Sequence, residues 1–332
     1  MRIKLFTHTD LDGIGCAILG KLAFDDIDIE YCNYDDINKK VKDFILSKQY
    51  DYYDHIYITD LSINKEVVEL IENTQPDTFK SSFYLNECFS LIDHHPTALW
   101  LNKYFWANVE EETILLHFND ETEIKEKVSG TYLFFMELLS NNYLTPSKHE
   151  YLILKEFVDI VRKYDTWLWK EKYNDIIPKQ WNDLFYILGR DRFIEETLYK
   201  IQIRDLEFSH TDTLLLELEQ EKINKYIDDK SKRIAITNIQ GYAVGVVFAE
   251  QYHSELGNRL SEKYQGLDFI VIINMDKSIS YRTVKDYVHL GNDVAKIYGG
   301  GGHAKAAGSP ISNEIREVLI NMLFNQDKDG LK

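Results

Sequence analysis

The chain has 332 residues, of which 44% are hydrophobic and 13% aromatic, and its formal net charge is −17. This length predicts two domains of roughly 150 residues, and the composition excludes a disordered or low-complexity chain. Its three cysteines form no CxxC pair, which argues against structural zinc and against a disulfide scaffold. The N-terminus soon becomes polar and no apolar run approaches ~18 residues, so we expect a cytoplasmic protein without a membrane span.

The acidic charge is concentrated in the first part of the chain. Residues 1–230 carry 44 acidic and 26 basic side chains, whereas residues 231–332 carry 11 acidic and 12 basic ones. A chain this acidic is a poor candidate for gripping long duplex DNA through counterion release. It can still bind a short anionic ligand where bound cations invert the local field.

The first ~100 residues alternate between strand and helix patterns. Strands are predicted over residues 2–8, 27–33, 55–61 and 88–93, with helices between them. This alternation predicts an α/β domain, in which helices flank a parallel sheet.

The rest of the chain changes character twice. Residues 128–172 are mainly helical, 179–191 are irregular, and 193–229 form one or two long helices. Strands then follow at 233–239, 242–249, 268–275, 278–284 and 307–311, with helices at 253–264, at 290–298 and at the end. We therefore predict an N-terminal catalytic domain over 1–190, a helical connector over 191–231, and a smaller mixed α/β domain over 232–332.

Acidic and histidine side chains follow three of the predicted strands, and one more aspartate lies near a helix end. They are His8, Asp10, Asp12, Asp60, Asp93, His94, His95 and Asp165. Because the carboxyl ends of parallel strands line the ligand crevice of an open sheet, we expect the strand-end residues to converge. Asp165 is chosen from the segment YDTW, and Asp159 six residues earlier is a competing residue.

A cluster of four carboxylates and two imidazoles predicts a metal centre. Its members are His8, Asp10, Asp12, Asp60, His94 and Asp165. Without a counter-charge the carboxylates would repel one another, and two divalent cations would neutralise all four. Oxygen and imidazole ligands suit Mn, Mg, Fe or Co, and we expect Mn²⁺, with Mg²⁺ or Co²⁺ as alternatives. Two such ions clamp the attacking and leaving oxygens of phosphoryl transfer. Each motif alone is more typical of a turn or a helix cap.

The C-terminal domain carries a second group of candidates, which would bind the substrate. They are Ser280, Arg282, Gly300, Gly301, Gly302, His303 and, with a weaker signal, Asn258. A run of glycines lets the backbone approach an anion closely and offer it N–H groups. Arg282 can form a bidentate pair with a phosphate, and His303 can donate to a phosphate or a base.

These motifs together resemble the DHH phosphoesterase superfamily, which includes RecJ nucleases, family II pyrophosphatases and small oligoribonucleases. HTDLDGIG, ITD and IDHH are similar to its catalytic motifs, and SISYRTV with GGGGHAKAAG is similar to its DHH-associated C-terminal domain. The resemblance covers both predicted domains. Within the superfamily the chain most resembles the nanoRNase B-type oligoribonucleases, through the HxDLDG opening, YDTW, and an LGN segment at residues 256–258.

The resemblance implies a role for each site residue. His8 and Asp10 would bind one metal ion, Asp12, His94 and Asp165 the other, and Asp60 would bridge the two. His95 would face the substrate phosphate, and Asp93 would orient the histidine pair. The implied reaction is the attack of a water activated by two metal ions on phosphorus.

We therefore expect a metal-dependent phosphodiesterase that degrades short single-stranded RNA to mononucleotides, from the 3′ end. One alternative keeps the chemistry but acts on cyclic mono- or dinucleotides or on 3′-phosphoadenosine 5′-phosphate. Another is a nucleotide sensor without activity, which the complete ligand set disfavours. We expect neither long duplex nucleic acid nor a membrane as partner, and the sequence leaves a homodimer open.

Overall fold

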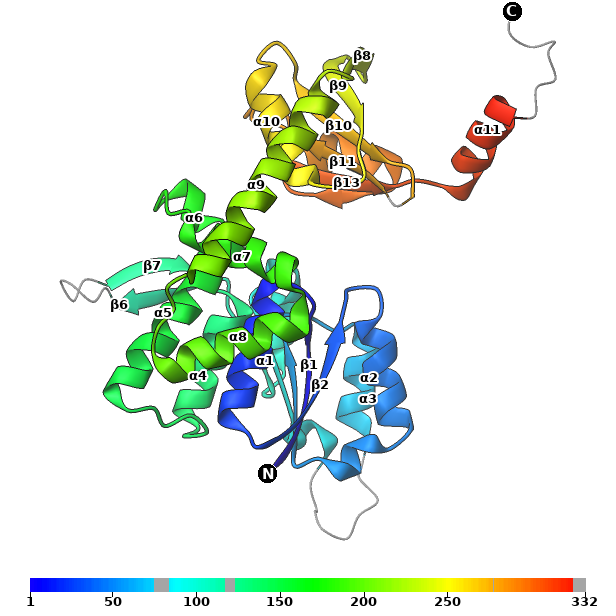
Figure 1. Cartoon of the computed structure of the whole chain (residues 1–332). Helices are drawn as coiled ribbons and strands as arrows, with labels where there is room; N and C mark the ends of the chain where they lie inside the picture. The colour runs from blue at the N-terminus through cyan, green and yellow to red at the C-terminus, as the bar shows by residue number, and fades with distance from the viewer. Residues whose placement is uncertain (75–83, 117–122, 277, 325–332) are drawn as a thin grey trace, which may run out of the picture. The chain divides into compact units, whose positions relative to one another are not determined.

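The computed structural model describes residues 1–74, 84–116, 123–276 and 278–324. The chain divides into two compact units, residues 1–216 and 217–332 (Figure 1). The division falls within the long helix α9 (His210–Ser231), inside the segment predicted to be the connector.

The first unit is built on a parallel sheet with strand order β2-β1-β3-β4-β5, which confirms the predicted α/β class. Its strands are β1 (Arg2–His8), β2 (Asp26–Cys32), β3 (His55–Thr59), β4 (Phe89–Asp93) and β5 (Ala107–Val109). The first four were predicted, and β5 was not. Because β1, β3 and β4 are neighbours, their carboxyl ends meet at one edge of the sheet.

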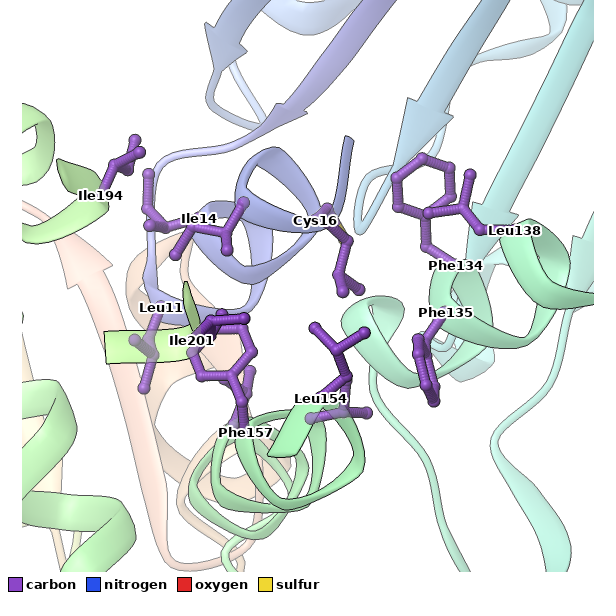
Figure 2. Packing of buried hydrophobic residues seen from close by; sticks show 14 of the residues in the cluster. Leu11, Ile14, Cys16, Phe134, Phe135, Leu138, Leu154, Phe157, Ile194 and Ile201 are labelled. Carbon is purple, nitrogen blue, oxygen red and sulfur yellow. The ribbon is translucent and has the colours of Figure 1, made fainter. Parts of the chain in front are cut away.

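Helices cover both faces of this sheet. They are α1 (Leu11–Ala23), α2 (Ile37–Leu46), α3 (Lys65–Asn73), α4 (Gly130–Ser140), α5 (Lys148–Asp165), α6 (Leu168–Glu171), α7 (Ile177–Leu188) and α8 (Arg190–Ile203). One hydrophobic core joins the sheet to α1, α4, α5, α7 and α8, and a second joins it to α2 and α3. Figure 2 shows Ile14 and Cys16 of α1 facing Leu154 and Phe157 of α5. Cys16 is fully buried there, and its Sγ lies 3.8 Å from the Thr131 hydroxyl.

Two local predictions for this unit were incomplete or wrong. Residues 179–191 are not irregular, because α7 covers most of them. Pro178 fits the first turn of that helix, and Trp181, Leu184 and Phe185 bury its apolar face. The sequence analysis also missed the antiparallel pair β6 (Glu112–Leu116) and β7 (Glu123–Lys127).

The second unit contains a six-stranded mixed sheet of order β12-β13-β11-β10-β9-β8. Its strands are β8 (Ala235–Ile239), β9 (Tyr242–Phe248), β10 (Phe269–Asn274), β11 (Ser278–Arg282), β12 (Gly301–Gly302) and β13 (Ala306–Pro310). The pair β9–β10 is parallel and the other pairs are antiparallel. Helix α10 (His253–Lys263) and part of α9 share one core, and α11 (Asn313–Phe324) follows the sheet.

The helix predicted over 290–298 is not an α-helix. The structure has a π-helical turn, η4 (Leu290–Val294), and then a 3₁₀ turn, η5 (Ala295–Tyr298). The backbone N–H groups of Leu290 and Gly291 donate to the carbonyls of Ala304 and His303, at 2.9 and 3.1 Å. These bonds anchor the start of the segment to the loop after β12. Among the described residues, no helix combines the length and apolarity needed to cross a membrane.

A buried ion cluster ties α5 to the segment that leads into α4. The Arg162 guanidinium of α5 lies 2.8 Å from the Glu126 carboxylate of β7, and both side chains are buried. The same guanidinium donates to the Lys127 carbonyl at 3.0 Å and to Asp159. Lys172 and Tyr173 also bond to Glu126. Breaking such a pair strands a buried charge, which is more costly than never having the pair.

We therefore expect Arg162→Met to destabilise the first unit by about 3 kcal/mol, because Glu126 keeps only its other partners. Arg192→Met is the matched control, since Arg192 is exposed and 3.9 Å from Glu196, and should change stability by less than about 0.5 kcal/mol. Urea unfolding followed by tryptophan fluorescence measures this, because all five tryptophans lie in the first unit. Equal midpoints for the two variants would contradict the expectation.

Candidate metal centre

The predicted ligands lie at element ends around one edge of the parallel sheet. His8 ends β1, Asp10 is the N-cap of α1, and Asp60 directly follows β3. His94 follows Asp93, the last residue of β4. Asp10 also caps its helix, since its carboxylate accepts from the Gly13 N–H at 3.1 Å, so the capping role and a ligand role coexist in one residue.

Two groups of side chains form within this edge. In one, His8 Nδ1 lies 2.8 Å from Asp10 Oδ2 and 3.6 Å from Asp60 Oδ2. In the other, the reference atom is Nε2 of His94. It lies 3.7 Å from Asp12 Oδ2, 3.4 Å from Asp165 Oδ2 and 3.3 Å from Asp60 Oδ1. The Asp60 carboxylate therefore directs one oxygen to each group.

The choice between Asp159 and Asp165 is clear in the fold. Asp165, the last residue of α5, lies in the second group. Asp159 points elsewhere on the same helix and pairs with Arg162 and Lys163. Three-residue sets with ligand spacing occur on both sides of Asp60, one with His8 and one with His94.

Buried polar atoms without a hydrogen-bond partner indicate that the cluster fits cations. Within the described residues, His8 Nδ1, Asp60 Oδ2 and His94 Nε2 are buried and make no hydrogen bond of acceptable geometry. Each such atom costs about 1–3 kcal/mol. A divalent ion in each group would satisfy these atoms and neutralise the carboxylates, so the residues present fit a pair of cations.

Asp60 is held in a strained backbone conformation. Its φ is +57°, in the left-handed region, and the residue is 1% exposed. Its backbone N–H donates to the Ile92 carbonyl at 2.9 Å, which ties it to β4. Such strain costs about 1–3 kcal/mol and is found where the surrounding structure fixes a functional side chain.

The electrostatics of the metal-free cluster favour bound protons. Burial, and then the nearby Asp12 and Asp10, raise the pKa of Asp60 well above its usual range. Burial and then Asp12 raise the pKa of Asp165 to about 7. Burial opposes the charge on His8, but Asp10 and Asp60 outweigh it and raise its pKa to about 10. Protons thus take the place of cations in limiting the repulsion.

The sequence analysis missed the residues that hold Asp12. Its carboxylate accepts from the backbone N–H groups of Gly130 and Thr131, at 2.6 and 2.9 Å, and the Thr131 hydroxyl donates to the Asp12 carbonyl at 2.6 Å. The start of α4 therefore holds the Asp12 carboxylate with two backbone N–H groups. Ser129 before an apolar run marks the helix start in the sequence, but nothing there pairs it with Asp12.

Asp93 and His95 form a hydrogen-bonded pair beside the cluster. Asp93 Oδ1 accepts from His95 Nδ1 at 2.7 Å and from the His94 backbone N–H at 2.8 Å. Because a carboxylate only accepts, the His95 proton lies on Nδ1. The Tyr34 hydroxyl lies 3.1 Å from His95 Nε2, and the sequence analysis did not single this tyrosine out.

The candidates in the second unit form two groups, one in or beside β11 and one in or next to β12. Ser280 and Arg282 are in β11, and Arg282 donates to the Ser254 hydroxyl at 3.1 Å. Its side chain packs beneath Gly257 of α10, the helix that carries Asn258. Gly301, Gly302 and His303 instead meet η4, and the Gly300 N–H donates to the Ala295 carbonyl of η5 at 2.9 Å.

A second LGN segment at residues 290–292 supports the glycine loop, and the sequence analysis chose only the one at 256–258. A Cβ at Gly291 would lie 2.1 Å from the Gly302 carbonyl oxygen, so only glycine allows this close approach. The repeated tripeptide was visible in the sequence. Its contact with the loop was not, because it depends on the π-helical turn.

Comparison with known proteins gives a relative similar along most of the chain and solved structures of similar fold. No model of a protein family matches the chain. The chain is 37% identical over 327 residues to the oligoribonuclease NrnB of Bacillus subtilis (strain 168). The alignment covers 97% of this chain and 76% of that protein. The crystal structure of exonuclease RecJ bound to manganese is similar in fold. Its TM-score is 0.52 at 16% identity, over 96% of this chain and 87% of that one.

The parallel sheet, its acidic edge and this likeness define a phosphodiester hydrolase of the DHH phosphoesterase superfamily, in which residues 93–95 supply the Asp-His-His motif. Within that superfamily the chain belongs to the family of NrnB oligoribonucleases.

Gly130→Ala tests the N–H groups that hold Asp12. The added Cβ would lie 2.7 Å from Asp60 Cβ and 3.0 Å from Asp12 Oδ2, so both carboxylates must shift. We expect Mn²⁺ affinity, measured by calorimetry, to fall by about 10–100-fold. Gly266→Ala is the control, because no atom within 4 Å would meet its Cβ. Unchanged affinity in Gly130→Ala would show that these N–H groups do not set ligand position.

Metal binding should release protons. Since the pKa values of Asp165 and His8 are raised to about 7 and about 10, both groups hold protons below those values, and cations must displace them. Mn²⁺ affinity should therefore weaken as pH falls from about 8 to about 6. Calorimetry in buffers of different ionisation enthalpy gives the proton count directly. A binding enthalpy independent of the buffer would contradict this expectation.

Proposed function

We propose that the chain is a metal-dependent oligoribonuclease that hydrolyses short single-stranded RNA to mononucleotides from the 3′ end. The observation that carries this proposal is the buried Asp60 carboxylate, which directs one oxygen to each of two histidine–aspartate groups. The choice of RNA rests on the 37% identity to an oligoribonuclease.

The first unit would supply the chemistry. When bound, two divalent ions, Mn²⁺ first and Mg²⁺ or Co²⁺ as alternatives, would activate water and offset the charge that develops at phosphorus. His8 and Asp10 would hold one ion and Asp60 would bridge to the other. Its remaining ligands would be Asp12, His94 and Asp165. The spacing of these side chains around Asp60 supports this division.

His95 would bind the substrate phosphate beside the two ions. Asp93 keeps a proton on Nδ1 and so fixes which nitrogen faces outward. The side chain of His95 is 31% exposed, whereas that of Asp93 is fully buried. This contrast supports a substrate contact for the histidine and an orienting role for the aspartate.

The second unit would recognise the end of a short substrate. The proposed contacts are Ser280, Arg282, Asn258, Gly300, Gly301, Gly302 and His303. The exposed backbone of Gly301 and Gly302 supports an anion contact there, and His303 is exposed beside them. A few contacts of this kind suit oligomers of a few nucleotides better than long strands.

The proposed compartment is the cytoplasm. Cys16, Cys32 and Cys88 are free thiols, and two of them are buried. Unpaired cysteines are typical of proteins in a reducing environment.

A 5′-labelled RNA pentamer with Mn²⁺ tests the reaction. Wild-type protein should give a ladder that shortens from the 3′ end to the labelled mononucleotide. Asp60→Asn should lower the rate by at least about 100-fold, because it removes the charge shared by both groups. Asp51→Asn is the control, since that aspartate lies in the exposed turn η1 (Gln49–Tyr52). His303→Ala should raise KM about tenfold and leave kcat nearly unchanged.

The same assay separates the alternatives. Cyclic dinucleotide and 3′-phosphoadenosine 5′-phosphate are run in parallel. If either is cut while the pentamer survives, the metal centre stands and the RNA assignment fails. If only labelled mononucleotide appears from the start, the direction of cleavage is wrong. If no substrate is cut and no metal binds, the enzyme assignment itself fails.

A further inference from the structure

Tyr34 lies in the turn that follows β2, between two parts of the metal centre. The carbonyl of Asn33 accepts from the backbone N–H groups of Asp36 and Ile37, at 3.2 and 3.0 Å. The Asn33 N–H in turn donates to the Asp36 carboxylate at 2.7 Å. These bonds form a tight turn that presents Tyr34 outward from the strand.

The turn is also fixed to the segment after β1. The Thr9 hydroxyl donates to Asn33 Oδ1 at 2.7 Å. Thr9 lies between His8 and Asp10, which are both proposed ligands. The position of Tyr34 is therefore coupled to the same loop that carries the first ligand pair.

The tyrosine contacts two histidines with different proposed roles. Its hydroxyl lies 3.1 Å from His95 Nε2, and the two rings meet edge to face, with centroids 5.9 Å apart. Its ring also packs on His8, at 4.9 Å between centroids. The residue nevertheless remains 57% exposed, so it sits on the open side of the cluster.

His95 is consequently held at both ring nitrogens. Its Nδ1–H donates to Asp93 at 2.7 Å, and its Nε2 lies 3.1 Å from the Tyr34 hydroxyl, so each ring nitrogen has a hydrogen-bond partner. A ring with both nitrogens engaged keeps a single orientation. Such preorganisation lowers the cost of placing a phosphate contact in the reactive arrangement.

We propose that Tyr34 is a positioning residue, which holds His95 in the orientation that receives the substrate phosphate. The proposal rests on the proposed function, in which His95 contacts that phosphate. A substrate phosphate beside Nε2 would therefore meet a ring whose orientation Asp93 and Tyr34 already fix. The packing of the Tyr34 ring on His8 is a separate contribution, which the loss of the hydroxyl alone leaves in place.

Tyr34→Phe separates the two contributions. It removes the hydroxyl and keeps the ring beside His8. At saturating Mn²⁺ we expect kcat/KM for the RNA pentamer to fall about tenfold, which is the loss expected for one hydrogen bond to a catalytic group. Mn²⁺ affinity should stay within about twofold, whereas Tyr34→Ala should weaken it as well. Tyr52→Phe is the matched control, because Tyr52 is 68% exposed and lies in η1.

A purely structural role of Tyr34 would leave the NMR signals of the His95 ring unchanged, so these signals are the decisive measurement. Nitrogen-15 NMR of histidine-labelled protein, without metal and with Mg²⁺, reports the hydrogen bond at Nε2, and a His95→Asn variant assigns the signal. Tyr34→Phe should shift the Nε2 resonance, because it removes the partner at that nitrogen, and leave the Nδ1 resonance unchanged. Tyr52→Phe should leave both resonances unchanged.

The proposal requires both changes. An unchanged Nε2 resonance in Tyr34→Phe would show that the hydroxyl does not hold the ring, and an unchanged kcat/KM would show that holding it does not serve the reaction. Either result overturns the proposal. If wild-type protein cuts no RNA, the proposed function fails, and a shifted Nε2 resonance would still establish that Tyr34 orients His95.

Discussion

Mutual repulsion among buried carboxylates is the constraint on which the rest of this structure depends. Asp10, Asp12, Asp60 and Asp165 meet at one edge of a parallel sheet, where Asp12 and Asp60 are fully buried and Asp10 and Asp165 are partly exposed. Only protons or cations can relieve the repulsion, and the orphaned nitrogen and oxygen atoms between them favour cations. Because Asp60 offers one oxygen to each side, a single strained residue determines the spacing of two sites.

Buried hydrogen bonds and an ion pair hold the elements that carry these carboxylates in place. The N-terminus of α4 holds Asp12 with two backbone N–H groups, and the ion pair of Arg162 with Glu126 fixes α5 to the segment just before α4. Both arrangements use charge in a dry environment, where a satisfied pair is rigid and a broken one is costly. Because these carboxylates are held rigidly, small displacements of the helix ends would change the affinity for metal ions.

The two units divide the properties that a hydrolase of short nucleic acids needs. Residues 1–230 hold all of the excess negative charge, with 44 acidic and 26 basic side chains. An anionic substrate would therefore need bound cations to approach the carboxylates. The second unit offers an exposed glycine strand, held by a π-helical turn that depends on Gly291. Residues 231–332 carry 12 basic and 11 acidic side chains, so this part of the chain is nearly neutral.

Local sequence patterns predicted the α/β class, the four main strands and the set of side chains at their ends. Period-two and helical patterns are local, and parallel strands must share an edge, so convergence followed from topology. The sequence analysis missed α7, the β6–β7 pair and the π-helical turn, because tertiary hydrogen bonds and burial determine the conformation of those segments. Only the tertiary structure paired Asp12 with α4 and Tyr34 with His95, and only it separated Asp165 from Asp159. Contacts between residues distant in sequence leave no periodic signal, so the fold alone reveals them.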